Sequence, residues 1–241
     1  MRGVVSRAPL RDAGRRVDVP VAVATWVIAF VAGQLVSAVI LASSGVDDAD
    51  LVPIPTLFAG VAATWIAYLA GMWFASQRSG SGDFVEDYRL HFAPIDLVGV
   101  PIGVLSQLVL VPLVYLPLSE LWPETFSEDR LSENAEKLVD RADGASMVLL
   151  VLMVCLFAPV VEELVYRGLL QGSFAARFDH VLALVIAAAW FAVIHFRPVE
   201  YPGLFVFGLV AGAGLLVTGR LGLPIVTHIG FNVTGLLLAL P

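Results

Sequence analysis

Three charged side chains interrupt an apolar stretch in the second half of the chain. Glu162, Glu163 and Arg167 are the only charges between Asp143 and Arg177. Ionisable groups inside a membrane span are costly and are candidates for function. Glu163 and Arg167 stand four residues apart, in the order that pairs on a helix, so we expect a local ion pair. Glu162 then remains available as a general acid or base; the alternative is that all three anchor a helix end at the interface.

Two histidines lie in other apolar runs, each four residues from a second notable side chain. Phe191 and His195 form the first pair, and His228 and Asn232 form the second. A spacing of four places each pair on one face of a helix. A single intramembrane histidine usually serves helix packing, but here the only two inside expected spans accompany the only intramembrane carboxylates.

Helix lengths indicate which of these groups meet. Glu162 and His195 each stand fifteen residues from a turn expected at 179–180, which is roughly 22 Å along a helix. Antiparallel neighbours would therefore hold them at one level. His228 is only eight residues beyond Arg220, or about 12 Å. It converges with them only if the last helix begins deeper than the others.

The composition indicates the kind of fold that positions these groups. The chain is 59% hydrophobic and 15% charged with a mean hydropathy of +0.87, whereas soluble domains are roughly 25% charged. We expect an all-α polytopic membrane bundle of about seven transmembrane helices, within a range of six to eight. The candidate spans are Val21–Ala42, Pro55–Ser76, Leu97–Leu118, Ala145–Ala176, Val181–Phe196, Gly203–Gly219 and Leu221–Leu240.

The polar segments complete this organisation. Residues 1–18 form a basic tail, and its arginines predict a cytoplasmic N-terminus by the positive-inside rule. Residues 19–144 hold the N-terminal helices, with a short interfacial segment in 77–96 and an acidic outer loop in 119–144 that contains a surface helix. Residues 145–241 form the candidate catalytic core. One cysteine precludes an internal disulfide, and a net charge of −7 argues against a nucleic-acid partner.

The three pairs of residues spaced by four lie in motifs that resemble those of a known family. Residues 162–168, Glu-Glu-Leu-Val-Tyr-Arg-Gly, are similar to EExxxR; residues 191–195 are similar to FxxxH; residues 228–232 are similar to HxxxN. These are the motifs of the CPBP intramembrane proteases, which include the CAAX prenyl endopeptidases and bacterial bacteriocin-processing or immunity proteins. The resemblance covers about 147–240; the first 145 residues share only their helical character.

The resemblance implies a role for each matching residue. Glu162 would be the base that activates water, with His195 as its partner. His228 and Asn232 would stabilise the oxyanion of the tetrahedral intermediate. The Glu163–Arg167 pair and Phe191 would support the shape of the site. The implied substrate is a membrane-bound peptide or protein within a lipid bilayer, and the implied location is the plasma (inner) membrane of a prokaryote. Neither the prenylation of the substrate nor the oligomeric state follows from the sequence.

The cofactor stays open at this stage. The family is often described as metalloproteases, and Glu162, His195 and His228 could together supply a zinc site with an open position for water. The other possibility is a metal-free, glutamate-dependent mechanism, which we favour because imidazole and amide groups also suit an oxyanion role. No HExxH motif is present.

Other mechanisms fit the residues less well. The string Gly80-Ser81-Gly82-Asp83 matches the GxGD pattern of aspartyl intramembrane proteases, but it lies in a polar connection and no second Asp lies in a span. Cys155 lies in an apolar run, where a free cysteine usually packs rather than reacts. The alternative function is a non-proteolytic membrane protein, either an immunity or scaffold factor or a proton-coupled carrier, that uses the same polar cluster structurally.

Overall fold

A computed structural model describes residues 17–46 and 51–240, and every regular element in these ranges is a helix. This confirms the expected all-α membrane bundle. Within the described residues, five helices are long and apolar enough to cross a membrane. They are α1 (Val19–Ala42), α2 (Ile54–Ser79), the run η2–α4–η3–α5 (Pro94–Val98, Gly99–Leu105, Ser106–Leu110, Val111–Leu121), the run α7–η4–α8–η5–α9 (Gly144–Val151, Leu152–Phe157, Ala158–Glu162, Glu163–Gln171, Gly172–Arg177), and α11 (Tyr201–Thr218).

Two further apolar helices are shorter than a full span, α10 (His180–Val193) and α12 (Gly222–Leu238). The seven helical runs match the seven candidate spans with small changes at their ends. In the Val181–Phe196 candidate, the helix ends at Val193 and His195 lies in the following turn. Phe196 adopts a positive φ of 53° there, and Pro198 cannot continue a helix because it has no N–H to donate.

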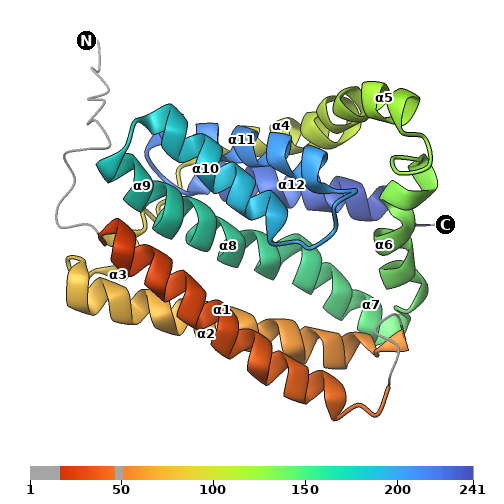
Figure 1. Ribbon diagram of the computed structural model, residues 1–241, viewed down its shortest axis with the longest axis horizontal. Helices are drawn as coiled ribbons and strands as arrows, with labels where there is room; N and C mark the ends of the chain where they lie inside the picture. Colours follow the sequence, from red (N-terminus) through yellow and green to blue (C-terminus); the bar gives the residue numbers. More distant parts are fainter. Residues whose placement is uncertain (1–16, 47–50, 241) are drawn as a thin grey trace.

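The first two helices form a hairpin along one side of the bundle, drawn from red to orange in Figure 1. Glycines allow the two backbones to approach closely: a Cβ on Gly33 would meet Thr64, and one on Gly60 would meet Ser37. The long helix from α7 to α9 runs beside this hairpin, with α11, α12 and α4 on its other side, while α10 also reaches α1 through the contact of Trp190 with Trp26 (Figure 1). The site residues on the long helix therefore lie between two layers.

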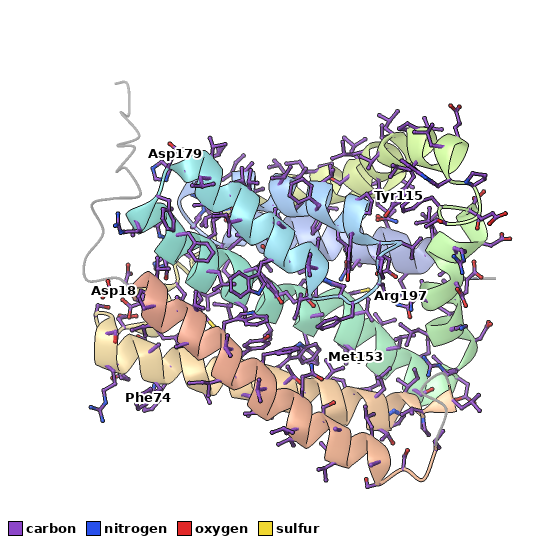
Figure 2. All side chains as sticks on the ribbon, viewed as in Figure 1. Asp18, Phe74, Tyr115, Met153, Asp179 and Arg197 are labelled. Atoms are coloured by element: carbon purple, nitrogen blue, oxygen red, sulfur yellow. The ribbon has the colours of Figure 1, made fainter. Side chains whose placement is uncertain are left out.

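The two polar connections, 77–96 and 119–144, each contain a helical segment. The acidic segment contains the expected surface helix, α6 (Glu128–Asp140), which stands across one end of the bundle with its polar side chains outward, while carbon-rich side chains cover the flanks (Figure 2). The expected interfacial segment contains only one α-helical turn, α3 (Phe84–Asp87). Its neighbour Tyr88 is buried and donates a hydrogen bond of 2.7 Å to the backbone carbonyl of Met72.

Pro159 does not break the long helix. It follows the π-helical segment η4, and the helix continues through Glu162 into a second π-helical segment, η5. A π-helix bonds each carbonyl to the N–H five residues later, and Pro159 has no N–H to give to Val154. The wider π turn thus accommodates the proline, and one carbonyl near the site needs another donor.

Helix α12 begins deep in the bundle. This is the condition under which His228 reaches the level of the other site residues. The space around Gly168, in the middle of η5, is closed by Leu221 and Tyr88. The N–H groups of Leu221 and Gly222 donate to the carbonyls of Arg89 and His91, at 2.9 and 3.0 Å. The segment between α3 and η2 therefore accepts hydrogen bonds from the first N–H groups of α12, at a position inside the bundle. His228 then needs only two turns to reach the level of Glu163.

Candidate functional site

Glu163 is the centre of a buried polar cluster. Its side chain is 0% exposed, and its Oε1 atom lies 3.1 Å from Arg167 Nη1 and 2.8 Å from His228 Nδ1. The expected pair with Arg167 is therefore present, four residues along the same helical run. The contact with His228 brings α12 against η5 and was not expected from the sequence. Two of the three motifs meet at this one carboxylate.

Arg167 is held by contacts on its other sides. The guanidinium donates from Nη2 to the carbonyl of Gly208, at 3.2 Å, and its Cζ lies 4.5 Å from the centre of the Phe191 ring. One helical turn further on, Gln171 donates to the carbonyl of Gly212 at 3.0 Å. These glycines leave the α11 backbone open to polar side chains from η5. The cation is thus shared between a carboxylate, a carbonyl and an aromatic face.

Phe191 joins the motifs at their apolar side. The ring is fully buried and makes edge contacts with His195 and His228, with centroids 4.9 and 5.8 Å apart. It also packs against Tyr166 and, as noted, against Arg167. One aromatic side chain therefore sets the spacing between both histidines and the arginine.

Glu162, the preceding residue, has a different environment. Its side chain is 24% exposed, and its Oε2 atom lies 3.8 Å from His228 Nε2. It borders a cavity of about 320 Å³ instead of joining the buried cluster. His228 thus stands between the two glutamates, with Nδ1 bound to Glu163 and Nε2 directed at Glu162.

His195 borders the same cavity as Glu162. The two residues come from separate segments, the end of α8 and the turn after α10. The Nδ1 atom lies 2.7 Å from the carbonyl of Phe191. Because a carbonyl oxygen only accepts, Nδ1 carries the hydrogen, and Nε2 is the atom left for another partner.

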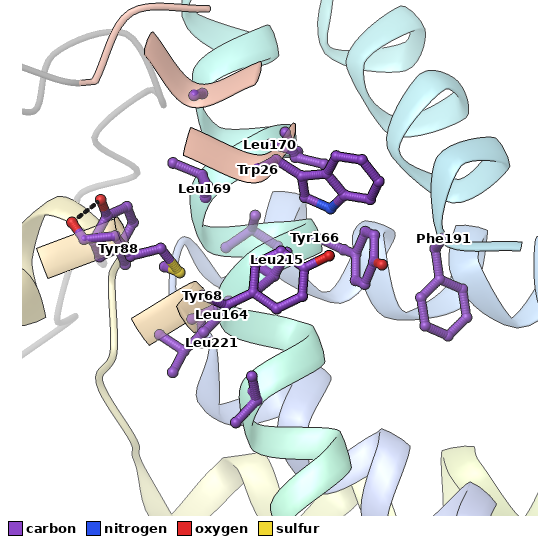
Figure 3. Close-up of a cluster of buried hydrophobic side chains, with 14 of the residues drawn as sticks. Trp26, Tyr68, Tyr88, Leu164, Tyr166, Leu169, Leu170, Phe191, Leu215 and Leu221 are labelled. Carbon is purple, nitrogen blue, oxygen red and sulfur yellow. Dashed lines mark hydrogen bonds between the residues drawn. The ribbon is translucent and has the colours of Figure 1, made fainter. Parts of the chain in front are cut away.

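The opposite wall of the cavity comes from the α1–α2 hairpin, which contains none of the three motifs. Its polar lining residues are Gln34, Ser37, Thr64 and Tyr68. A usable signal was present in the sequence, since Gln34 is the only amide side chain in the first apolar run. Figure 3 shows Tyr68 beside Trp26 and directed toward Tyr166, which projects from η5. The size of the cavity is at the lower end of the range for small-ligand sites.

Asn232 lies apart from this cavity. Its Nδ2 atom donates a hydrogen bond of 2.8 Å to the carbonyl of Val154. This is the carbonyl that Pro159 leaves without a donor in the π-helical register. The HxxxN motif therefore contacts the helix of the glutamates twice, through His228 at Glu163 and through Asn232 at η4.

Two residues that suggest other mechanisms lie elsewhere. Cys155 is buried in a separate apolar cluster that includes Ile54, Leu150 and Leu236. Asp83 of the GxGD string caps α3 by accepting hydrogen bonds from the N–H groups of Val85 and Glu86. Both residues have local packing or capping roles.

Glu162, His195 and His228 do not form a three-ligand metal site as placed here. Within the described ranges, 17–46 and 51–240, no group of three or more His, Cys, Asp or Glu side chains is arranged to hold a metal ion. His228 Nδ1 is bound to Glu163 and His195 Nδ1 to a backbone carbonyl, so each histidine has only Nε2 available for a further partner.

Comparison with known proteins gives one match. Residues 144–234 match the family model described as type II CAAX prenyl endopeptidase Rce1-like. No curated protein and no solved structure matches the chain. The matched residues contain all three motifs and the whole Glu163 cluster, whereas the α1–α2 hairpin lies outside them. Residues 144–234 are therefore similar to the CAAX protease family of intramembrane endopeptidases, the same family that the motifs resemble.

Proposed function

We propose that the protein is an intramembrane endopeptidase that hydrolyses a peptide bond of a membrane-associated substrate with water activated by Glu162. The observation that carries this proposal is the shared cavity of Glu162 and His195. Amide hydrolysis without a covalent intermediate needs a base, a positioned water and a space for the peptide. The cavity supplies that space inside an otherwise apolar layer, next to one partly exposed carboxylate.

The two glutamates have separate tasks in this proposal. Glu163 is buried with Arg167 and His228, so it holds the helices together and does not reach the cavity. Glu162 accepts a proton from water as the water oxygen attacks the scissile carbonyl carbon. It returns that proton to the amine nitrogen as the C–N bond breaks. His195 Nε2 orients the same water, since Nδ1 is engaged by Phe191.

His228 and Asn232, the two residues of the HxxxN motif, do not line the cavity and act through their contacts beside it. His228 Nε2 is the part of the HxxxN motif that approaches the reacting carboxylate, at 3.8 Å, and we propose that it acts on the oxyanion or the proton of Glu162. Asn232 supports this arrangement through the helix backbone, by binding the carbonyl of Val154. The oxyanion role that the resemblance implies for Asn232 requires a movement of its amide away from that carbonyl.

The test is the exchange Glu162→Gln, which keeps size and removes the base. With purified protein in liposomes, we expect this variant to leave cleavage of a membrane-bound peptide near background while its unfolding midpoint stays unchanged. Glu133→Gln is the matched control, because Glu133 lies on the surface helix α6, outside the cavity, and pairs with Lys137. Wild-type turnover by Glu162→Gln would refute the role of Glu162 as the base, and absence of turnover by the wild-type protein itself would favour a scaffold or carrier.

Two peptides define the substrate class. One is a peptide with a farnesylated C-terminal cysteine motif, and the other is an unprenylated peptide anchored by a transmembrane helix. The family name describes prenyl endopeptidases, so we propose that the prenylated peptide is cleaved faster. Equal rates would assign the protein to general intramembrane proteolysis.

We further propose that catalysis uses no metal ion. The ligand geometry at Glu162, His195 and His228 supports this view. Dialysis against a chelator should leave turnover unchanged, and elemental analysis of the active protein should find less than one zinc per chain. Loss of activity on dialysis, with recovery on adding zinc, would overturn the metal-free mechanism but leave the proteolytic function intact.

The protein is an integral membrane protein. We propose a prokaryotic plasma membrane with the N-terminus in the cytoplasm, because the five arginines of residues 1–16 precede the first span; that tail lies outside the described residues. Two contacts support the expected grouping of the connections on the two sides of the membrane. Arg220 pairs with Asp96 at one end of the bundle, and Arg197 donates a hydrogen bond to Asn134 of α6 at the other end. Cysteine labelling of the tail in sealed vesicles tests the orientation.

A further inference from the structure

The cavity has an unused hydrogen-bond donor on the wall opposite Glu162. Tyr68 of α2 lines the cavity, is 6% exposed, and its hydroxyl makes no hydrogen bond within the described part of the chain. Its polar neighbours are Tyr166 and Glu162, but neither forms a well-aligned bond with it. Buried hydroxyls in proteins are almost always bonded. An unbonded one that faces a candidate active site needs an explanation.

Two other buried tyrosines in this protein have hydrogen-bond partners for their hydroxyls. Tyr88 donates to the carbonyl of Met72, and Tyr115 donates to the carbonyl of Val199, each at 2.7 Å. Only Tyr68 of these three borders the cavity. The hydroxyls of Tyr88 and Tyr115 are therefore bonded, whereas that of Tyr68, on the cavity wall, has no partner within the described part of the chain.

The donors of the motifs are largely engaged elsewhere. Asn232 Nδ2 binds Val154, His228 Nδ1 binds Glu163, and His195 Nδ1 binds Phe191. Peptide hydrolysis needs donors aimed at the carbonyl oxygen where negative charge develops. A phenol on the wall facing the base is placed to meet that oxygen when the peptide lies between the two walls.

We propose that Tyr68 is a further catalytic residue, whose hydroxyl donates a hydrogen bond to the carbonyl oxygen of the scissile peptide. The inference rests on the proposed proteolytic function and deepens it. As the water oxygen bonds to the carbonyl carbon, the C=O electron pair moves to oxygen and a water proton moves to Glu162. Tyr68 keeps its proton and stabilises the new oxyanion. On collapse, the C–N bond breaks and Glu162 protonates the leaving amine.

The proposal also assigns a role to the hairpin outside the family match. Tyr68 lies on α2, whereas the matched residues begin at 144. The catalytic machinery would then be completed by a helix from the N-terminal half. Close packing of α1 on α2, at Gly33 and Gly60, makes the pair rigid enough to hold a donor in place.

The variant Tyr68→Phe tests this role in the full-length protein in liposomes, with the prenylated peptide as substrate. We expect kcat to fall by about 100-fold to 1000-fold, as on removal of one oxyanion donor, with KM little changed. We expect the unfolding midpoint to stay the same or rise, because the lost hydroxyl has no protein partner.

Tyr88→Phe is the matched control, since it removes a buried hydroxyl that is bonded and lies outside the cavity. It should lower the unfolding midpoint and leave kcat per folded molecule unchanged. If Tyr68→Phe instead retains wild-type kcat, changes only KM, or loses activity in step with stability, the proposal is overturned. The variant Glu162→Gln distinguishes failure of the Tyr68 proposal from failure of the proposed function. If Glu162→Gln is inactive while Tyr68→Phe is fully active, the proteolytic function stands and only the role of Tyr68 is refuted.

Discussion

The Nδ1 atom of His228 lies 2.8 Å from the Oε1 atom of Glu163. The histidine of the third motif is therefore bound by the second glutamate of the first motif, although its other nitrogen approaches Glu162. Glu163 accordingly connects two charged or polar partners from different helices, Arg167 and His228. This buried row aligns η5 with α12 and leaves Glu162 as the carboxylate that borders the cavity.

The Glu163–Arg167 pair should be indispensable to folding. Replacing Glu163 by Gln leaves Arg167, which is 1% exposed, as a buried cation without its carboxylate. We expect a loss of about 3–5 kcal/mol in the free energy of unfolding, measured by reversible denaturation in detergent. The double variant Glu163→Gln with Arg167→Met should be less damaged than Glu163→Gln alone. If the two single changes simply add, the pair is not coupled as described.

Asn232 and Pro159 should show a compensating relationship. Asn232→Ala removes the donor of the Val154 carbonyl and should cost about 1–3 kcal/mol. Pro159→Ala restores an N–H to the helix, so the variant carrying both changes should recover much of that loss. A double-mutant cycle on unfolding free energies measures the coupling. Equal destabilisation by Asn232→Ala in both backgrounds would contradict the assigned role.

Gly103 should be sensitive to a single added carbon. A Cβ there would meet the backbone of Thr227 and Phe231 on α12, which flank His228. Gly103→Ala should push α4 and α12 apart and lower both the unfolding midpoint and the turnover rate. Gly214→Ala is the matched control, because a Cβ on Gly214 has no neighbour closer than 3.5 Å. Equal behaviour of the two variants would show that the close approach is unimportant.

The start of α10 should depend on pH through Asp179. Hydrogen bonds from the N–H groups of Val181 and Leu182 lower the pKa of this exposed carboxyl below its usual range. A group with a lowered folded-state pKa adds stability above its unfolded pKa and loses it as pH falls through the folded one. The unfolding midpoint should therefore fall on acidification below about pH 4.

Asp179→Asn is the control for that measurement. It keeps the capping oxygen but removes the titrating group, so the part of the acid dependence due to this site should disappear. An unchanged profile would assign the dependence to other carboxyls.

Much of this protein could be predicted from its sequence. Apolar runs longer than a membrane's width have few alternatives to spanning it, because backbone groups in lipid must be bonded within a helix. The Glu163–Arg167 pair was also predictable, since spacing along one helix determines which side chains are neighbours. The turn at 179–180 followed from the same arithmetic, and it brings Glu162 and His195 to one cavity.

Only the tertiary structure decided how the helices meet. The deep start of α12 depends on carbonyls at Arg89 and His91, which lie more than a hundred residues earlier in the chain. The different environments of Glu162 and Glu163 depend on which of the two side chains points toward α12. The π-helical turns change the direction of these side chains, and the residue spacing in the sequence does not predict that change. Tyr68 is an ordinary aromatic residue in the sequence, because the cavity that it borders exists only once the hairpin packs against the long helix.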